Sequence, residues 1–280
     1  MKLAFESYPG PDAGPFLLLL HGFLSSRAQW IPNIKSLCEF CRPVTAELWG
    51  HGSSPVPGEA KYYKAAGYSE AFETLRKEIG AGSWFVCGQS FSAGLIANYS
   101  LQHPEVVRGQ ILTNSLSAFS PPTRYGSDED REAQAKTIEA EGLRAIEKFR
   151  FHPRYAKRFP AEIKQAMLAD AARLSPKGIA NAIRYTRPEL SVLGQFERTL
   201  VPTLIVNGLR ENAFQPLLEG IKPLLRTLKV VNLDGGHSIN IEAASSFNEV
   251  VKRFMTAGSE STSAAAAECC TNFHETPFGP

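Results

Sequence analysis

The chain has 280 residues, of which 43% are hydrophobic, and a formal net charge of +2. This length allows one large core with an inserted subdomain, and the small net charge gives no bulk attraction to nucleic acid or to an anionic membrane. The longest early apolar run, residues 16–20, is too short to span a bilayer, and no signal peptide follows Met1. We therefore expect a globular, cytoplasmic protein.

Strands and helices alternate over the first 113 residues. Residues 3–7 are typical of an edge strand, and residues 16–20 are typical of a buried parallel strand. The elements expected after these are a helix at 29–38, a strand at 43–48, a helix at 65–79, a strand at 84–86, a helix at 91–102 and a strand at 109–113. This succession predicts an α/β fold with a mostly parallel, doubly wound sheet.

The next part of the chain, residues 117–193, shows no strand pattern. Ser127 with Asp130 resembles a capping box, and Pro160 and the pair Ser175-Pro176 indicate further helix starts. An insertion of roughly 75 residues is too long to be a plain loop. We interpret it as a helical cap.

Strands are expected again at 203–206 and 229–233, and a final amphipathic helix at 241–255. The sequence from 257 onward is of low complexity and is predicted to be disordered. The predicted organisation is therefore a core formed by residues 1–116 and 194–256, a helical cap at 117–193, and a disordered tail at 257–280.

The stretch VCGQSFSAG, residues 86–94, carries a serine between small residues where a strand meets a helix. This setting is typical of a nucleophile elbow, in which a tight turn exposes the Ser90 hydroxyl above the sheet. Gly88 and Ser92 must be small for the strand and the helix to meet closely. The usual pattern is Gly-x-Ser-x-Gly, so Ser92 is a departure from it.

With the elbow, three further segments make the chain resemble the α/β-hydrolase superfamily over about residues 3–255. They are HGFLSS at 21–26, LWGHGSS at 48–54, and PTLIVNGLRE at 202–211 followed by GGHSINIEAASSF at 235–247. The resemblance implies the α/β-hydrolase fold and a triad in the order serine, acid, histidine. Many reactions share this frame, so the resemblance leaves the reaction open.

The expected catalytic residues are Ser90 as nucleophile, His237 as general base and Glu211 as the acid that orients the imidazole. His237 lies between the last strand and the last helix, and Glu211 comes three residues after Gly208. Asp234 is the rival acid, although it is better placed to cap its own turn.

The backbone N–H groups of Phe23 and Phe91 are expected to form the oxyanion hole. The rings of Phe23, Phe91 and Phe214 are candidates for an apolar acyl pocket, and Phe214 is equally compatible with a place in the core. His21 and His51 are expected to shape glycine turns through hydrogen bonds to the backbone.

Other polar features have two interpretations. The cap residues Arg150, Arg154, Lys157 and Arg158 form either a solvated face or a site for a carboxylate or phosphate. Trp30 and Trp49 are expected in loops near the mouth of the site. Each is interpreted either as a pocket residue or as a core residue.

The chain has five cysteines, and Cys38 and Cys41 form a CxxC without the second pair that a zinc site needs. No histidine, aspartate and cysteine grouping has metal-ligand spacing, so we expect neither a metal nor a cofactor.

These features together predict a capped serine hydrolase that cleaves a small or medium ester, thioester or lactone through an acyl-enzyme on Ser90. The alternatives are a C–C bond hydrolase or lyase with the same triad, and a ligand receptor with residual hydrolase activity. A serine at the elbow argues against haloalkane dehalogenases and epoxide hydrolases, which need a carboxylate there. The expected partner is a small-molecule substrate, and the oligomeric state is left open.

Overall fold

A computed structural model describes residues 1–224 and 228–270, and its centre is a seven-stranded sheet in the order β1-β3-β2-β4-β5-β6-β7. Only β1 pairs antiparallel, with β3, and every other neighbouring pair is parallel. The strands are β1 (Phe5–Ser7), β2 (Phe16–Leu20), β3 (Arg42–Ala46), β4 (Trp84–Gln89), β5 (Val107–Thr113), β6 (Thr203–Gly208) and β7 (Leu228–Leu233). The predicted α/β fold with a mostly parallel sheet is confirmed.

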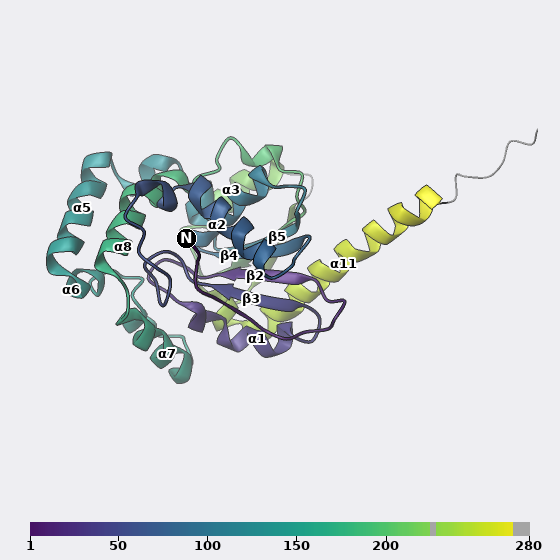
Figure 1. Cartoon of the computed structure of the whole chain (residues 1–280), viewed down its shortest axis with the longest axis horizontal. Helices are drawn as coiled ribbons and strands as arrows, with labels where there is room; N and C mark the ends of the chain where they lie inside the picture. Colours follow the sequence, from purple (N-terminus) through teal and green to yellow (C-terminus); the bar gives the residue numbers. More distant parts are fainter. Residues whose placement is uncertain (225–227, 271–280) are drawn as a thin grey trace, which may run out of the picture.

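Alternate residues of the inner strands enter two separate cores, because successive side chains point to opposite faces of a sheet. Leu18 and Leu20 of β2 pack on the face covered by α2 (Ala65–Glu78) and α3 (Phe91–Gln102). Leu17 and Leu19 pack on the other face, beneath α1 (Ile31–Leu37) and α11 (Ala244–Cys270). Figure 1 shows α2 and α3 on one side of the sheet and α1 on the other. Burial on both faces explains why β2 is apolar throughout.

Between β5 and β6 the described chain is helical and contains no strand. The α-helices here are α4 (Leu116–Phe119), α5 (Asp128–Glu141), α6 (Leu143–Ile146), α7 (Ala161–Ala171) and α8 (Pro176–Asn181), which continues as the π-helix η5 (Ala182–Thr186). In Figure 1, α5 to α8 lie together at one end of the molecule. We call residues 117–193 the helical insertion.

Helix starts inside the insertion follow the expected local chemistry. The capping box of Ser127 and Asp130 is confirmed, with both reciprocal hydrogen bonds present. Ser175 caps α8 through a 3.2 Å bond to the N–H of Gly178, and Pro176 is the first helical residue. Pro160 is the N-cap of α7 rather than its first residue, one position from the prediction.

Short helices complete the fold. The 3₁₀ turns are η1 (Arg27–Trp30), η2 (Ala60–Tyr63), η3 (Pro122–Tyr125), η4 (Pro153–Tyr155), η6 (Arg187–Glu189), η7 (Phe196–Arg198) and η8 (Lys222–Leu224), and the remaining α-helices are α9 (Gln215–Ile221) and α10 (Ile239–Glu242). The predicted helix at 29–38 is thus divided into η1 and α1.

The final helix differs from its predicted bounds. We expected a helix at 241–255 and a disordered tail from 257, whereas α10 ends at Glu242 and α11 runs from Ala244 to Cys270. Helix therefore also covers part of the segment predicted to be disordered, and residues 271–280 lie outside the described residues. Phe247, Val251 and Phe254 of α11 pack against the sheet.

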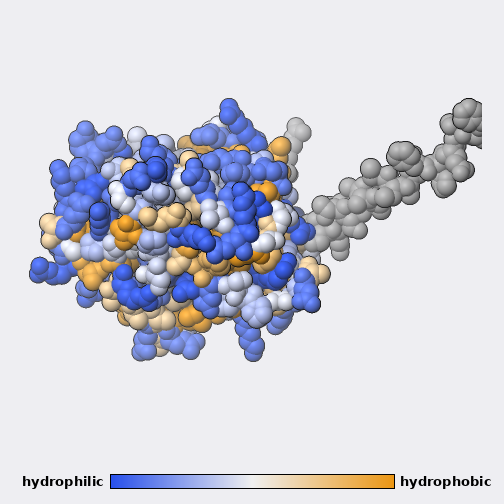
Figure 2. All heavy atoms as spheres, viewed as in Figure 1, coloured by the Kyte–Doolittle hydropathy of each residue, from blue (hydrophilic) through white to orange (hydrophobic). Residues whose placement is uncertain are grey.

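Polar side chains cover most of the face seen in Figure 2, with apolar residues in small groups between them. No helix in the described part of the chain is long and apolar enough to cross a membrane.

Candidate active site

Ser90 occupies the turn between β4 and α3 with φ 54° and ψ −108°, a conformation that L-residues rarely adopt. The turn is tight because β4 and α3 approach closely: a Cβ on Gly88 would lie 2.4 Å from the carbonyl oxygen of Ser92. Only glycine fits there. The strained backbone holds the half-buried Ser90 side chain at the carboxyl end of the sheet.

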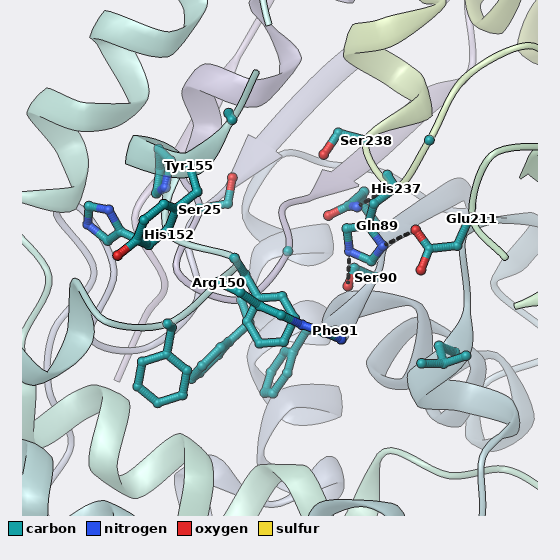
Figure 3. Close-up of a pocket in the computed structure, with 18 of the residues that line it drawn as sticks. Ser25, Gln89, Ser90, Phe91, Arg150, His152, Tyr155, Glu211, His237 and Ser238 are labelled. Atoms are coloured by element: carbon teal, nitrogen blue, oxygen red, sulfur yellow. Dashed lines mark hydrogen bonds and ion pairs between the residues drawn. The ribbon is translucent and has the colours of Figure 1, made fainter. Parts of the chain in front are cut away.

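Three side chains that are distant in the sequence form one hydrogen-bonded chain. His237 Nε2 lies 2.8 Å from Ser90 Oγ, and His237 Nδ1 lies 3.0 Å from Glu211 Oε2 (Figure 3). They follow β4, β6 and β7, whose carboxyl ends meet at the same edge of the sheet. A carboxylate only accepts hydrogen bonds, so Nδ1 carries the imidazole hydrogen and Nε2 accepts from the Ser90 hydroxyl.

The environment keeps Glu211 ionised. Burial has the largest single effect and raises the pKa of this carboxyl group, but the hydrogen bond from His237 and the electrostatic effects of His237, Asn114 and Arg150 together outweigh it. The pKa of Glu211 therefore lies below its usual value of 4.5.

Asp234 does not contact the imidazole. Its carboxylate accepts two hydrogen bonds from Arg210, at 2.9 and 2.6 Å, and the side chain is 75% exposed. The expectation that Asp234 caps its own turn is wrong, because the N–H of Gly236 donates to Glu242 Oε2 instead, at 3.0 Å.

The backbone N–H groups of Phe23 and Phe91 have no acceptor within the described residues. They lie in neighbouring segments, since a Cβ on Gly22 would lie 2.2 Å from Gln89 Oε1 and 3.5 Å from Ser90 Cβ. The N–H of Gly22 itself is occupied by Gln29 Oε1, at 3.1 Å. Both N–H groups are therefore free to bind an acceptor.

His21 and Ser92 connect the loop after β2 to its neighbours. His21 Nδ1 donates to the carbonyl oxygen of Gly22, at 2.8 Å, and its Nε2 accepts from the N–H of Leu48, at 3.2 Å. Burial lowers the pKa of His21 to about 4, so the ring is neutral. The buried Ser92 hydroxyl donates to the carbonyl oxygen of His21, at 2.5 Å, which is where the departure from glycine is accommodated.

Sequence reasoning missed Asn114, a buried residue with φ 46° at the end of β5. Its Nδ2 donates to the carbonyl oxygen of Gly236, at 2.9 Å, and its Oδ1 accepts from the N–H of Gly208, at 3.1 Å. Asn114 therefore joins the loop that carries Glu211 to the loop that carries His237. No local sequence pattern marks such a bridge between two later strands.

A cavity of about 1120 Å³ opens at Ser90 and His237. Phe23 and Phe91 line it, and their rings stack with centroids 5.2 Å apart. Phe214 does not line it: this residue is fully buried in the core, so its assignment to the acyl pocket is corrected. Trp30 and Trp49 are also fully buried core residues.

Part of the basic group in the insertion faces this cavity. Arg150, Lys157 and Arg158 line it, and in Figure 3 Arg150 extends toward Phe91. Arg158 pairs with Glu242, at 3.1 Å. Arg154 does not line the cavity and pairs with a surface carboxylate of the insertion.

No cluster of three metal-ligating side chains occurs in the described part of the chain. The Ser90 hydroxyl, the imidazole of His237 and the carboxylate of Glu211 meet at the cavity, and the two free backbone N–H groups belong to Phe23 and Phe91, which also line it. This set suits attack by an oxygen nucleophile on a carbonyl carbon.

Comparisons with known proteins agree with the fold. A protein of Bacillus subtilis named as a 2-succinyl-6-hydroxy-2,4-cyclohexadiene-1-carboxylate synthase is 21% identical over 88% of this chain and 92% of its own length. The carboxylesterase Nap of the same organism is 23% identical over 89% of this chain and 81% of its length.

Two solved structures are similar over most of their length. MenH from S. aureus has a TM-score of 0.79 and 19% identity, covering 91% of this chain and 98% of that one. An esterase from Thermogutta terrifontis has a TM-score of 0.75 and 22% identity, with 91% and 93% covered. The sequence profile of the alpha/beta hydrolase fold matches residues 15–244. The chain is a member of the α/β-hydrolase family.

Proposed function

We propose that this protein is a serine hydrolase that cleaves a small or medium ester, thioester or lactone through an acyl-enzyme on Ser90. The observation that carries the proposal is the hydrogen-bonded chain from Ser90 through His237 to Glu211 at the cavity. The relatives named as carboxylesterases support ester cleavage.

In this mechanism His237 Nε2 takes the hydroxyl proton as Ser90 Oγ attacks the carbonyl carbon. Glu211 stabilises the imidazolium ion that forms, and the N–H groups of Phe23 and Phe91 stabilise the oxyanion. Each such donor contributes about 100- to 1000-fold in rate. His237 then gives the proton to the leaving group, and water repeats the sequence to release the acid. The helical insertion acts as the cap that bounds the cavity.

A second candidate is a lyase or C–C bond hydrolase with the same three residues. The relative named as a synthase, which matches 88% of this chain, supports this alternative. In a lyase Ser90 would remove a proton from the substrate and form no acyl-enzyme. Trapping of an acylated serine therefore separates ester hydrolysis from the lyase reaction, and turnover of esters separates it from C–C bond hydrolysis.

The test is labelling with a fluorophosphonate probe together with turnover of an ester panel. We expect Ser90 to be labelled, and Ser90→Ala to lose labelling and several orders of magnitude of turnover while its melting temperature stays close to wild type. Ser238→Ala, which alters another serine lining the cavity, should keep both. Ester turnover that survives in Ser90→Ala would sink the acyl-enzyme mechanism.

A further inference from the structure

Arg187 is a feature of the cavity that the proposed hydrolysis leaves unused. It begins the 3₁₀ turn η6, lines the cavity and is only 8% exposed. Its guanidinium carbon lies 4.6 Å from the ring centroid of Phe23, 5.7 Å from that of Tyr125 and 5.8 Å from that of Phe149. A cation is thus held among aromatic rings inside the site.

The charge of Arg187 has no carboxylate partner among the described residues. The one hydrogen bond that its guanidinium group makes within the described residues runs from Nη1 to the neutral Gln134 Oε1, at 2.6 Å. Three other arginines have side chains no more than 13% exposed, and each pairs with carboxylates: Arg76 with Glu73, Arg131 with Asp128, and Arg184 with Glu132 and Glu139. The fold compensates these three and leaves Arg187 uncompensated.

An unpaired buried charge costs stability, and the faces of neighbouring rings offset only part of that cost. Burial lowers the pKa of Arg187 to about 10, so the side chain is still cationic at neutral pH. A guanidinium has five N–H donors, of which Gln134 occupies one. Since the side chain lines the cavity, its remaining donors are available to a molecule that enters it.

We propose that the guanidinium fork of Arg187 binds a free carboxylate of the substrate, so that the substrate class is an ester that also carries a carboxylate. This inference rests on the proposed hydrolase function. One cation enclosed by rings matches a planar monoanion, which it binds through two parallel hydrogen bonds. Other cations line the cavity, among them Arg124, Lys148 and Arg150, but these three are exposed, so the buried position offers a single charge and suits a monoanion better than a dianionic phosphate.

An aromatic stack adjoins both Arg187 and the residue after Ser90. The Phe91 ring follows Ser90 directly, the Phe23 ring stacks on it, and Arg187 lies over the other ring of this pair, Phe23. Arg187 and Ser90 line the same cavity, so one molecule in it can meet both. A half-ester of a dicarboxylic acid carries an ester for Ser90 and a carboxylate for Arg187.

Binding to the Ser90→Ala variant tests the inference without turnover. We expect monomethyl adipate, which has one carboxylate, to bind at least tenfold more tightly than the neutral dimethyl adipate in calorimetric titration. Arg187→Gln in the same background should abolish this preference. Arg158→Gln is the matched control, because Arg158 lines the same cavity but already pairs with Glu242, and it should keep the preference.

Equal binding of the two adipate esters, or an equal loss of preference in Arg158→Gln and Arg187→Gln, would overturn the proposal. Tighter binding of pentyl phosphate than of monomethyl adipate would also overturn it. The proposed function fails separately: a preserved carboxylate preference without labelling of Ser90 rejects the hydrolase alone, and labelling without the preference rejects the Arg187 site alone.

Stability gives an independent measurement. Removing an uncompensated charge should leave the melting temperature of Arg187→Gln equal to or above that of wild type, whereas Arg184→Gln should melt at a lower temperature because it removes the ion pairs with Glu132 and Glu139. Arg187→Lys keeps the charge but lacks the planar fork, so it should weaken the carboxylate preference several-fold. A Lys variant with the full preference contradicts recognition by the fork.

Discussion

The proposed role of Glu211 can be tested decisively by a single substitution. Glu211→Gln keeps the size of the side chain but removes its charge and lets it donate to His237, which favours the wrong tautomer. We expect a loss of roughly 100- to 10,000-fold in kcat on an ester that the wild type turns over. Asp234→Asn should cost far less, because Asp234 bonds Arg210 and not the imidazole.

The two variants are compared by steady-state kinetics on protein with a wild-type melting profile. A larger loss in Asp234→Asn than in Glu211→Gln would move the acid to Asp234 and refute the assignment.

The residues of the hydrogen-bonded chain could be proposed from the sequence because each follows a recognisable strand with a characteristic glycine. Ser90 follows Gly88, Glu211 follows Gly208 by three positions, and His237 follows two glycines. Asn114 and Arg187 carry no such mark. Their environment depends on which segments the fold brings to them, and an unpaired buried cation looks like any other arginine in the sequence.

At the scale of elements, Ser92 fixes helix α3 to the loop after β2. Ser92→Ala removes the hydroxyl that bonds the carbonyl oxygen of His21 and leaves that buried acceptor unsatisfied, at a cost of about 1–3 kcal/mol. The loop carries the free N–H of Phe23, so kcat should also fall, by less than the roughly 100-fold that follows loss of a whole oxyanion donor.

Chemical denaturation and kinetics check this expectation against Ser100→Ala, a second buried serine of α3. The hydroxyl of Ser100 has no hydrogen-bond partner within the described residues, so its removal should change neither quantity appreciably. Equal effects of the two substitutions would show that the bond to His21 has no special role.

The elements of the sheet could be predicted because strands buried on both faces are continuously apolar, as β2 is. The boundaries of α11 could not be predicted from the sequence. Its apolar residues Phe247, Val251 and Phe254 mark only the part that packs on the sheet, so the expected end at residue 255 reports packing rather than the length of the helix.

For the whole molecule, the two fully buried histidines, His21 and His51, make stability depend on pH. Burial lowers the pKa of His21 to about 4, and burial together with the nearby His21 ring lowers that of His51 to about 3. The rings lie 4.9 Å apart. Between about pH 6.5 and pH 4 the unfolded chain therefore binds protons that the folded chain does not. Stability is fully present above pH 6.5 and is lost as the pH falls through this window.

Each histidine contributes a slope of up to about 1.4 kcal/mol per pH unit to the free energy of unfolding. We expect urea denaturation between pH 5 and pH 8 to show this decline, and His51→Gln to flatten it because one of the two protons is no longer taken up on unfolding. His103 lies at the surface beside Glu105. The free energy of unfolding of His103→Gln should therefore decline more steeply with falling pH than that of His51→Gln. A His51→Gln curve that runs parallel to wild type would mean that burial of this imidazole does not govern the acid sensitivity of the fold.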